Sequence, residues 1–531
     1  MLFRSVSVDY KSLGVRQLGS IYEGLLEFRV RIAGEKLAVV KEKGREVYSP
    51  FKDLSGREKT KVENQGSYVS RGHVYLENDK RERKATGSYY TPDHIVKYIV
   101  EHAVGPVLQD KFDGLRPKLR EAQRERREFF KQQEAFTKRG MKPKAGEQAD
   151  LIGQDLVDEL FNIKVLDPAM GSGHFLVEAV DYITDKTLEF LNGFPWNPVL
   201  VHLEKMRNTI QEQMDQQNID IDAKRLTDVN LLKRHVLKRC IYGVDLNPMA
   251  LELAKVSLWL DCFTLGAPLS FLDHHLRWGN SLIGSTMAEV DAIRTAKDVQ
   301  LPLTATSDWQ GLAQAVQAMV DVGGMPDITT NQVANSKKHF QSALADVETF
   351  KRVLDLHTAR WFVESSNLNA RSKKSKTNIF DEMLRSGELF EWAHGRVVSP
   401  VAHSALARNG REAVEEAAVA AEEKRFFHWE LEFPEVFHGR RPGTQNAVER
   451  LNSGGFDAVI GNPPYLVVGN YECLFSAFLE FVDFDTSSLD YLAKRSTFAV
   501  DERKSLFGVG AAYGLTFPEN CSYTLPVLGN L

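Results

Sequence analysis

The stretch Val165–Phe175, VLDPAMGSGHF, is an apolar run that leads through a turn of small residues into a helical pattern. Such a run predicts a buried strand, and glycines in the turn would let a ligand approach the backbone closely. The turn lacks both the Lys-Ser or Lys-Thr of a P-loop and the GxGxxG spacing of dinucleotide enzymes. Alone it is weak evidence, because an ordinary strand-to-helix turn has the same composition.

Two more apolar runs repeat this arrangement further along the chain. Ile241–Asp245, IYGVD, ends in an acidic residue and is followed by a helical pattern, and a third run closes at Trp278-Gly279-Asn280. Strands alternating with helices predict an α/β fold with a doubly wound parallel sheet. Ligands of such sheets bind at the carboxyl ends of the strands, where Asp245 is placed to accept the ribose hydroxyls of an adenosine cofactor and Asn280 to reach its adenine. Each residue could instead be a helix N-cap or a turn former.

The motif Asn462-Pro463-Pro464-Tyr465 follows the predicted strand Phe456–Gly461. An amine attached to an aromatic ring is a poor nucleophile, and two hydrogen-bond acceptors would help to localise its lone pair. The Asn462 side-chain oxygen and the Pro463 carbonyl can supply them, the prolines stiffen the turn, and the Tyr465 ring offers a stacking face for a base outside the duplex. The alternative is a plain strand-ending turn.

The rest of the chain is expected to be mainly helical. Leu13–Ile32 has apolar residues at helical spacing and predicts an N-terminal packing layer. Between Lys111 and Lys144 there are twelve Lys or Arg against five Asp or Glu. This predicts an exposed basic helical arm, which is either a phosphate-binding surface or a solvated helix face. Residues 288–424 predict a helical insertion, after which the α/β pattern resumes.

Composition bounds the class of protein. The net charge of −5 argues against a uniformly basic nucleic-acid coat, so any DNA contact would come from local basic surface. The four cysteines lie far apart, which favours a reduced chain without a zinc or disulfide framework, and no metal site is expected. No apolar stretch is long enough to span a bilayer, so we expect a cytoplasmic protein without membrane partners.

Taken together, these motifs resemble the amino-group DNA methyltransferases of the gamma motif order, specifically the methyltransferase part of large type IIG restriction–modification enzymes. In that family a GSYYTP motif precedes the glycine-rich motif, as Gly87–Pro92 does here. The resemblance implies an N6-adenine DNA methyltransferase of a restriction–modification or phage-defence system, with a Rossmann-like fold that binds S-adenosylmethionine (SAM). Its expected partners are double-stranded DNA with a flipped adenine and a separate specificity or nuclease component.

The resemblance also implies residue roles. For Thr91 and Pro92 the alternative is a helix start with Thr91 as the cap and Pro92 at the first position, and both can hold. Many relatives carry Asp where this chain has Asn280, which puts the role of that residue in question. Asn462, Pro463, Pro464 and Tyr465 would form the catalytic loop, and the cofactor-binding residues would be Tyr90, Thr91, Pro92, Asp167, Pro168, Ala169, Gly171, Gly173, Asp245 and Asn280.

The chain departs from the family in having only a short, weakly patterned tail after the catalytic motif and no recognisable nuclease motif before residue 87. Restriction activity is therefore not expected. Two alternatives stay open: a truncated, inactive relative that binds SAM or DNA, and a glutamine or RNA methyltransferase. The expected parts are an N-terminal helical and linker layer (1–86), a SAM-binding core (87–284) with the basic arm (105–160), a helical insertion (285–425), the resumed core (426–470) and an atypical tail (471–531).

Overall fold

A computed structural model gives the fold of the chain, which divides into two compact units. Among the described residues, one unit contains 28–78 with Thr91, and the other lies within 92–462. The residues that the structure describes are 28–42, 45–65, 67–78, 91–139, 146–216, 226–294, 305–363, 405–440, 448–451 and 454–462.

The described part of the first unit, residues 28–78, is built mainly of short antiparallel strands. β1 pairs with β5, and β2 lies between β3 and β4. The predicted helix over Leu13–Ile32 is wrong at its end, because FRVRI alternates apolar and charged residues, a strand period that pairs with VYLEN. The remainder of that prediction lies outside the described residues. The elements are β1 (Phe28–Ile32), β2 (Leu37–Glu42), β3 (Arg45–Pro50), η2 (Phe51–Asp53), α2 (Gly56–Asn64), β4 (Tyr68–Val69) and β5 (Val74–Asn78).

The second unit contains the predicted parallel sheet, with four strands in the order β11-β6-β7-β8. Val165 lies beside both Ala458 and Ile241, and Asp245 lies beside Trp278. The strand predicted over Phe456–Gly461 is shorter than expected. The strands are β6 (Val165–Asp167), β7 (Ile241–Asp245), β8 (Leu276–Trp278) and β11 (Ala458–Val459).

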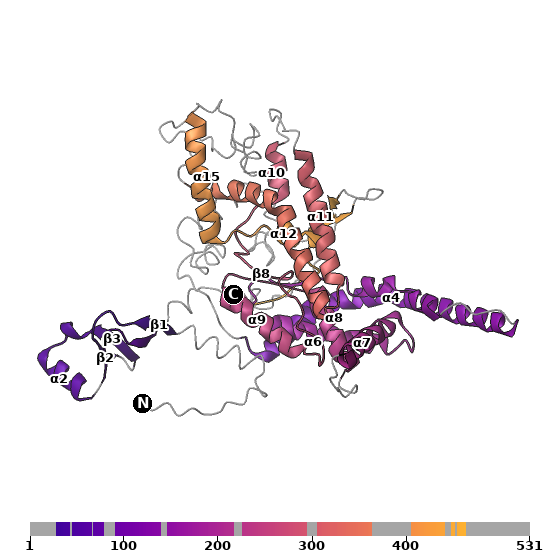
Figure 1. The fold of residues 1–531 in the computed structure, drawn as a ribbon, viewed down its shortest axis with the longest axis horizontal. Helices are drawn as coiled ribbons and strands as arrows, with labels where there is room; N and C mark the ends of the chain where they lie inside the picture. The colour runs from indigo at the N-terminus through magenta and orange to yellow at the C-terminus, as the bar shows by residue number, and fades with distance from the viewer. Residues whose placement is uncertain are drawn as a thin grey trace. The chain divides into compact units, whose positions relative to one another are not determined.

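Helices connect the strands and cover the sheet (Figure 1). Between β6 and β7 the described residues form three helices where the sequence suggested one, whereas α9 alone joins β7 to β8. Gly243 of β7 faces α6 so closely that a Cβ there would lie 2.8 Å from Leu176 Cδ1, which explains the glycine. The helices of this layer are α4 (Asp93–Lys138), α5 (Asp155–Leu160), α6 (His174–Leu191), α7 (Pro198–Gln216), α8 (Asp228–Cys240) and α9 (Pro248–Asp261), with η3 (Gly146–Leu151).

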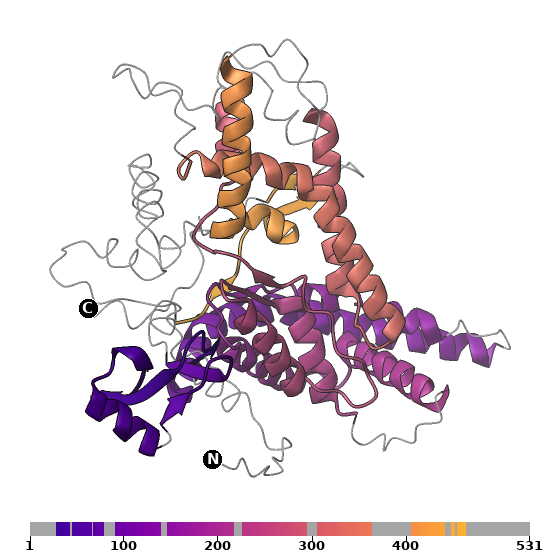
Figure 2. The same cartoon turned by 60° about the vertical axis from the view of Figure 1, so that its left-hand side comes forward.

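The predicted insertion is helical where the structure describes it, and its helices gather on one side of the α/β core (Figure 2). Thr329 and Gln332 form a capping box at the start of the longest of them, which fixes where that helix begins. The helices are α10 (Met287–Arg294), α11 (Ala305–Gly324), α12 (Thr330–Ala359) and α15 (Ala405–Lys424).

A buried ion pair fastens the α11–α12 turn of this insertion to the core. The Lys238 ammonium of α8 pairs with Asp327, whose carboxylate also accepts hydrogen bonds from Ser336 Oγ at 2.6 Å and from the Phe271 backbone N–H at 2.9 Å. Neither side chain of the pair is more than 1% exposed. The buried Arg234 guanidinium also donates to the backbone carbonyls of Pro326 at 3.2 Å and Asp327 at 2.5 Å. Because the Lys238–Asp327 pair and its hydrogen bonds join α8 to this turn, the junction acts as a structural latch.

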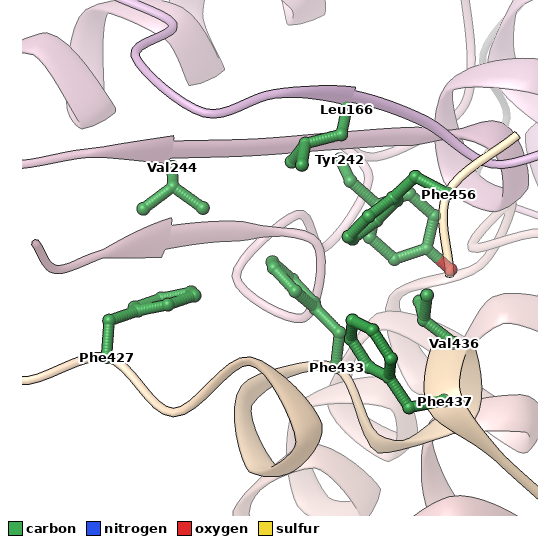
Figure 3. Packing of buried hydrophobic residues seen from close by; sticks show 8 residues of the cluster. All are labelled: Leu166, Tyr242, Val244, Phe427, Phe433, Val436, Phe437 and Phe456. Carbon is green, nitrogen blue, oxygen red and sulfur yellow. The ribbon is translucent and has the colours of Figure 1, made fainter. Parts of the chain in front are cut away.

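The segment after the insertion forms the second cover of the sheet. Phe427, Phe433 and Phe437 pack against Leu166, Tyr242 and Val244 from the strands, together with Val436 and Phe456 (Figure 3). The stretch Phe427–Phe437 is therefore a packing element of the sheet. Its elements are α16 (Trp429–Glu432) and α17 (Pro434–Phe437), which lead into the hairpin β9 (His438–Arg440) and β10 (Val448–Arg450).

None of the described helices combines the length and the apolar character needed to cross a bilayer.

Candidate functional site

The carboxyl edge of the sheet brings together residues that the sequence placed at separate strand ends. Asp167 ends β6, Asp245 ends β7, and Asn280 follows β8 by two residues. Asn462 follows β11 by three residues. Because all four strands are parallel, these positions lie along one edge, as the sequence predicted.

The turn after β6 is shaped by its own backbone. The Asp167 carboxylate accepts the Ala169 N–H at 3.0 Å, and Gly173 N–H donates to the Met170 carbonyl at 2.8 Å. Gly173 has a φ of 83°, and a Cβ there would lie 3.1 Å from Ala254 Cβ, so glycine is needed for conformation and for space. Gly171 has a φ of 54°, but a Cβ there would meet nothing within 4 Å, which leaves open space beside the turn.

Asp245 ties this turn to the second strand. One carboxylate oxygen accepts the Gly171 N–H at 2.8 Å, and the other accepts the Asn247 N–H at 2.7 Å. Asn247 in turn caps α9 by accepting the Met249 N–H at 2.9 Å. A carboxylate has about four lone-pair sites, so two acceptor positions on the half-buried Asp245 remain for a ligand.

Both carboxylates are strongly perturbed by burial. Asp167 is 1% exposed, and desolvation raises its pKa to about 8, an effect only partly offset by its backbone hydrogen bond. Desolvation also raises the pKa of Asp245, to about 6. Within the described part of the chain, neither group forms an ion pair with Lys, Arg or His. One buried and one half-buried carboxyl group, neither paired with a cation among the described residues, favour a site that binds a positively charged ligand.

The end of β11 lies directly against Asp167. Gly461 has a φ of 148°, and a Cβ at this position would lie 2.7 Å from Asp167 Oδ1. Asn462, the first residue of the proposed catalytic motif, therefore follows a backbone that touches the end of β6. The description stops there: Pro463, Pro464 and Tyr465 lie outside the described residues, as does Tyr90.

Asn280 is held in a turn of its own. Its side-chain oxygen accepts the Leu282 N–H at 3.1 Å, its backbone N–H donates to the Arg425 carbonyl at 2.8 Å, and the residue is 6% exposed. Its amide oxygen therefore has the turn-forming role that was predicted as the alternative. That bond leaves the amide nitrogen and one lone pair of the oxygen for contact with a ligand.

The beginning of α4 also reaches the glycine turn. Asp93 Oδ1 lies 3.3 Å from His174 Nε2, the first residue of α6. The predicted capping arrangement is off by one residue: Pro92 itself is the N-cap, no side chain caps the helix, and Asp93 is the first helical residue. Thr91 precedes this cap and is 7% exposed.

Sequence reasoning missed an apolar platform beside Asp245. Leu246, Met249 and Trp278 are 43%, 58% and 42% exposed. Trp278 Nε1–H donates to the Leu246 carbonyl at 2.9 Å, and the Arg425 guanidinium lies 3.8 Å from the centre of the indole ring. Leu246 and Trp278 adjoin the quoted motifs and could have been found there, whereas Arg425 lies 147 positions away and carried no signal.

The edge can be compared with the chemistry of SAM, which carries a sulfonium, an ammonium, a ribose diol and an adenine ring. Asp245 supplies a carboxylate with free acceptor positions, and Asp167 supplies a carboxyl group whose raised pKa a cationic ligand would lower. The space at Gly171 and the exposed faces of Leu246 and Trp278 supply room and apolar surface. The donor and acceptor set therefore fits this group.

Comparison with known proteins agrees with the motif-based resemblance and confirms it at the level of the domain. Residues 239–480 match the Eco57I restriction-modification methylase family. This matched range contains the ends of β7, β8 and β11. No solved structure matches the chain.

Two curated proteins are similar to parts of the chain, one over most of its length and the other over about a third. "Putative type II restriction enzyme and methyltransferase RM.MjaORFECS2P" of Methanocaldococcus jannaschii is 24% identical over 426 residues, which cover 74% of this chain and 29% of that protein. "Adenine-specific methyltransferase PglX" of Lacticaseibacillus casei is 30% identical over 189 residues, 34% of this chain and 14% of that protein. The chain thus spans less than a third of the length of these relatives.

Proposed function

Because the chain carries a domain of the Eco57I restriction-modification methylase family, we propose that it is a SAM-dependent DNA methyltransferase acting on the exocyclic amine of a flipped adenine. The observation that carries this proposal is the meeting of Asp167, Asp245 and Gly461–Asn462 at one sheet edge. Similarity to a protein named as an adenine-specific methyltransferase supports the choice of base.

In this proposal SAM supplies the methyl group when it is bound. Asp245 accepts the two ribose hydroxyls at the lone pairs that Gly171 and Asn247 leave free. Asp167 offers its carboxyl group to the positively charged end of the cofactor. Leu246 and Trp278 cover the adenine ring and exclude water from it.

The target amine is held by the catalytic motif. The Asn462 side-chain oxygen and the Pro463 carbonyl accept hydrogen bonds from its two N–H groups, so that its lone pair is available for attack. Tyr465 stacks on the flipped base and Pro464 stiffens the loop. Positioning and electrostatics provide most of the acceleration, and the methylated amine, which is positively charged after transfer, releases one proton to solvent, so no general base is required. Tyr90, Thr91 and Pro92 help to hold the methionine end of the cofactor, and Pro168, Ala169 and Gly173 line its pocket.

The experiment is transfer of radiolabelled methyl from SAM to mixed-sequence double-stranded DNA by the purified chain, with a parallel SAM-binding titration. Asn462→Ala is expected to lower transfer by at least about a hundredfold while SAM affinity stays within twofold, because the lost acceptor acts on the amine. Asn208→Ala is the matched control, since Asn208 is an exposed residue of α7. It should leave both quantities unchanged.

Each alternative has its own result. SAM binding without label in DNA would support the inactive relative, and label in RNA or in glutamine side chains but not in DNA would support the other methyltransferase classes. Absence of SAM binding would overturn the cofactor assignment.

A further inference from the structure

The C-terminal half of α4 carries a row of cations along one face. Arg120, Arg124, Arg127, Lys131 and Lys138, called here the basic stripe, are all exposed. Their spacings of four, three, four and seven residues place them within about 60° of one another around a helix of 3.6 residues per turn. The basic stripe therefore forms a line parallel to the helix axis and not a ring around it.

The opposite face of the same helix is the packed one. The buried residues Leu115, Leu119, Ala122 and Gln133 lie between about 110° and 170° from the centre of the basic stripe by the same helical geometry. Figure 1 shows this half of α4 running outward beyond α7. The apolar side fixes the helix on the unit, and the cations point away from it into solvent.

Little negative charge compensates the basic stripe within the described part of the chain. No carboxylate there forms an ion pair with Arg120, Arg127 or Lys131. Arg124 pairs with Glu121 at 3.0 Å and Lys138 with Glu134 at 2.8 Å, but all four side chains of these pairs are at least 67% exposed, so the attraction is weak. Three unpaired cations in one line leave a positive field along the face.

We propose that the basic stripe binds the phosphate backbone of double-stranded DNA. The stripe spans 18 residues, or about 27 Å of helix, which is the length of about eight base pairs. A membrane surface is less favoured, because Phe130 is the one exposed aromatic side chain beside the stripe in the described helix and the Arg126 guanidinium lies 4.7 Å from the centre of its ring, while Phe136 lies about 150° away around the helix. The substrate class rests on the proposed function, but the charge pattern does not.

Contacts to phosphate carry no sequence information, so the basic stripe would add affinity and not specificity. It would also make binding depend on salt, because each neutralised phosphate releases condensed counterions. This salt dependence distinguishes the basic stripe from the carboxyl edge of the sheet, because that edge contains carboxyl groups and no row of cations among the described residues.

The test is the affinity of the purified chain for a 30-base-pair mixed-sequence duplex, measured by fluorescence anisotropy over a series of NaCl concentrations. The triple variant Arg120→Gln/Arg127→Gln/Lys131→Gln is expected to bind roughly tenfold or more weakly at 0.1 M NaCl. The slope of log affinity against log salt should fall by about 0.9 for each lost contact, or about 2.7 in all.

The control Arg57→Gln/Lys337→Gln/Lys338→Gln removes the same charge from exposed positions of α2 and α12. It should match the wild type in affinity and slope, and circular dichroism should give all three proteins the same melting temperature. An unchanged slope in the stripe variant, equal losses in both variants, or no binding of duplex by the wild type would overturn the proposal. Binding to anionic phospholipid vesicles that depends on the stripe, with DNA binding unaffected, would also overturn it.

Failure of this proposal is distinguishable from failure of the proposed function. If the wild type methylates DNA but the stripe variant has an unchanged salt dependence of DNA affinity, the proposed function stands and the proposed role of the basic stripe is wrong. If the chain binds duplex DNA through the basic stripe but transfers no methyl group, the proposed role of the stripe stands and the proposed function is wrong.

Discussion

Asp167 and Asp327 are both buried carboxyl groups of the same unit, but their surroundings differ in one respect. Asp327 has the Lys238 ammonium against it, with Ser336 and a backbone N–H completing its hydrogen bonds. Asp167 has backbone N–H contact and no cation among the described residues, and its pKa rises to about 8. A compensated carboxylate holds elements together, whereas an uncompensated one is costly and marks a place where a ligand brings the missing charge.

The largest expected effect tests the compensated side of this comparison. Asp327→Asn leaves the Lys238 ammonium buried without a counter-charge and should lower the free energy of unfolding by about 3–5 kcal/mol. Urea denaturation measures the loss, and SAM affinity of the folded protein should stay within twofold. Adding Lys238→Met should recover much of the stability. A double variant as unstable as the single one would contradict the latch.

The next effect tests the uncompensated side. Asp245→Asn keeps one acceptor oxygen but removes the charge, and SAM affinity should fall by about 1.5–3 kcal/mol, or roughly ten- to a hundredfold, as for charged hydrogen bonds elsewhere. Calorimetric titration measures the affinity. The stability change should be smaller than that of Asp327→Asn. Equal SAM affinity in variant and wild type would remove Asp245 from the site.

A smaller effect follows from the contact between β11 and β6. Gly461→Ala would place a methyl group 2.7 Å from Asp167 Oδ1 in a backbone conformation that favours glycine, at a cost of order 1–3 kcal/mol. Both SAM affinity and methyl transfer should fall. Gly171→Ala is the informative partner, because its Cβ meets nothing within 4 Å in the protein and only backbone strain applies there. Identical losses in stability and in affinity for the two variants would show that the Asp167 contact has no role.

The smallest effect is on pH. Asp245, with a pKa of about 6, is mostly ionised at pH 7 and mostly protonated at pH 5, so SAM affinity should fall about tenfold between these values. Asp167 stays largely protonated over this interval because its pKa is about 8. Asp245→Asn should abolish this pH dependence of SAM affinity. If the variant still shows it, another group is responsible for the titration.

Stability of the ligand-free protein should change in the opposite direction. A carboxyl group whose folded pKa is raised binds more protons in the folded state than in the unfolded state, so its contribution is greatest below its ordinary pKa of 3.8. That contribution is lost as pH rises toward about 8. Urea denaturation of wild type and Asp167→Asn at pH 5 and pH 8 would show it.

The carboxyl edge was predictable because each of its parts is local. In Val165–Gly173 and Ile241–Asp245 an apolar run and the turn after it lie within ten residues, and their placement at one edge follows from the parallel sheet. The positions of Asp167, Asp245 and Gly461–Asn462 are confirmed. Their roles remain predictions, and Pro463–Tyr465 lie outside the described residues.

Features that depend on distant partners were not predictable. Lys238 and Asp327 are 89 residues apart, and nothing in either neighbourhood indicates the other. Arg425 reaches Trp278 because its backbone lies beside Asn280, a pairing without a local pattern. The apolar residues of Phe28–Ile32 fit both a helical and a strand periodicity. Pairing with β5, which lies more than forty residues further along the chain, makes this segment a strand.

The position of β11 has a consequence for how the protein is made. The Lys164 N–H donates to the Asp457 carboxylate across 293 positions of chain, and the strand that carries Asn462 pairs with β6. At about 5–20 residues per second, a ribosome needs roughly 15–60 seconds to add those residues. Until then one edge of β6 has no neighbour and the aromatic cluster lacks Phe456. A nascent chain therefore exposes an unpaired strand edge while those residues are added, and chaperones that recognise such edges would meet it in that interval.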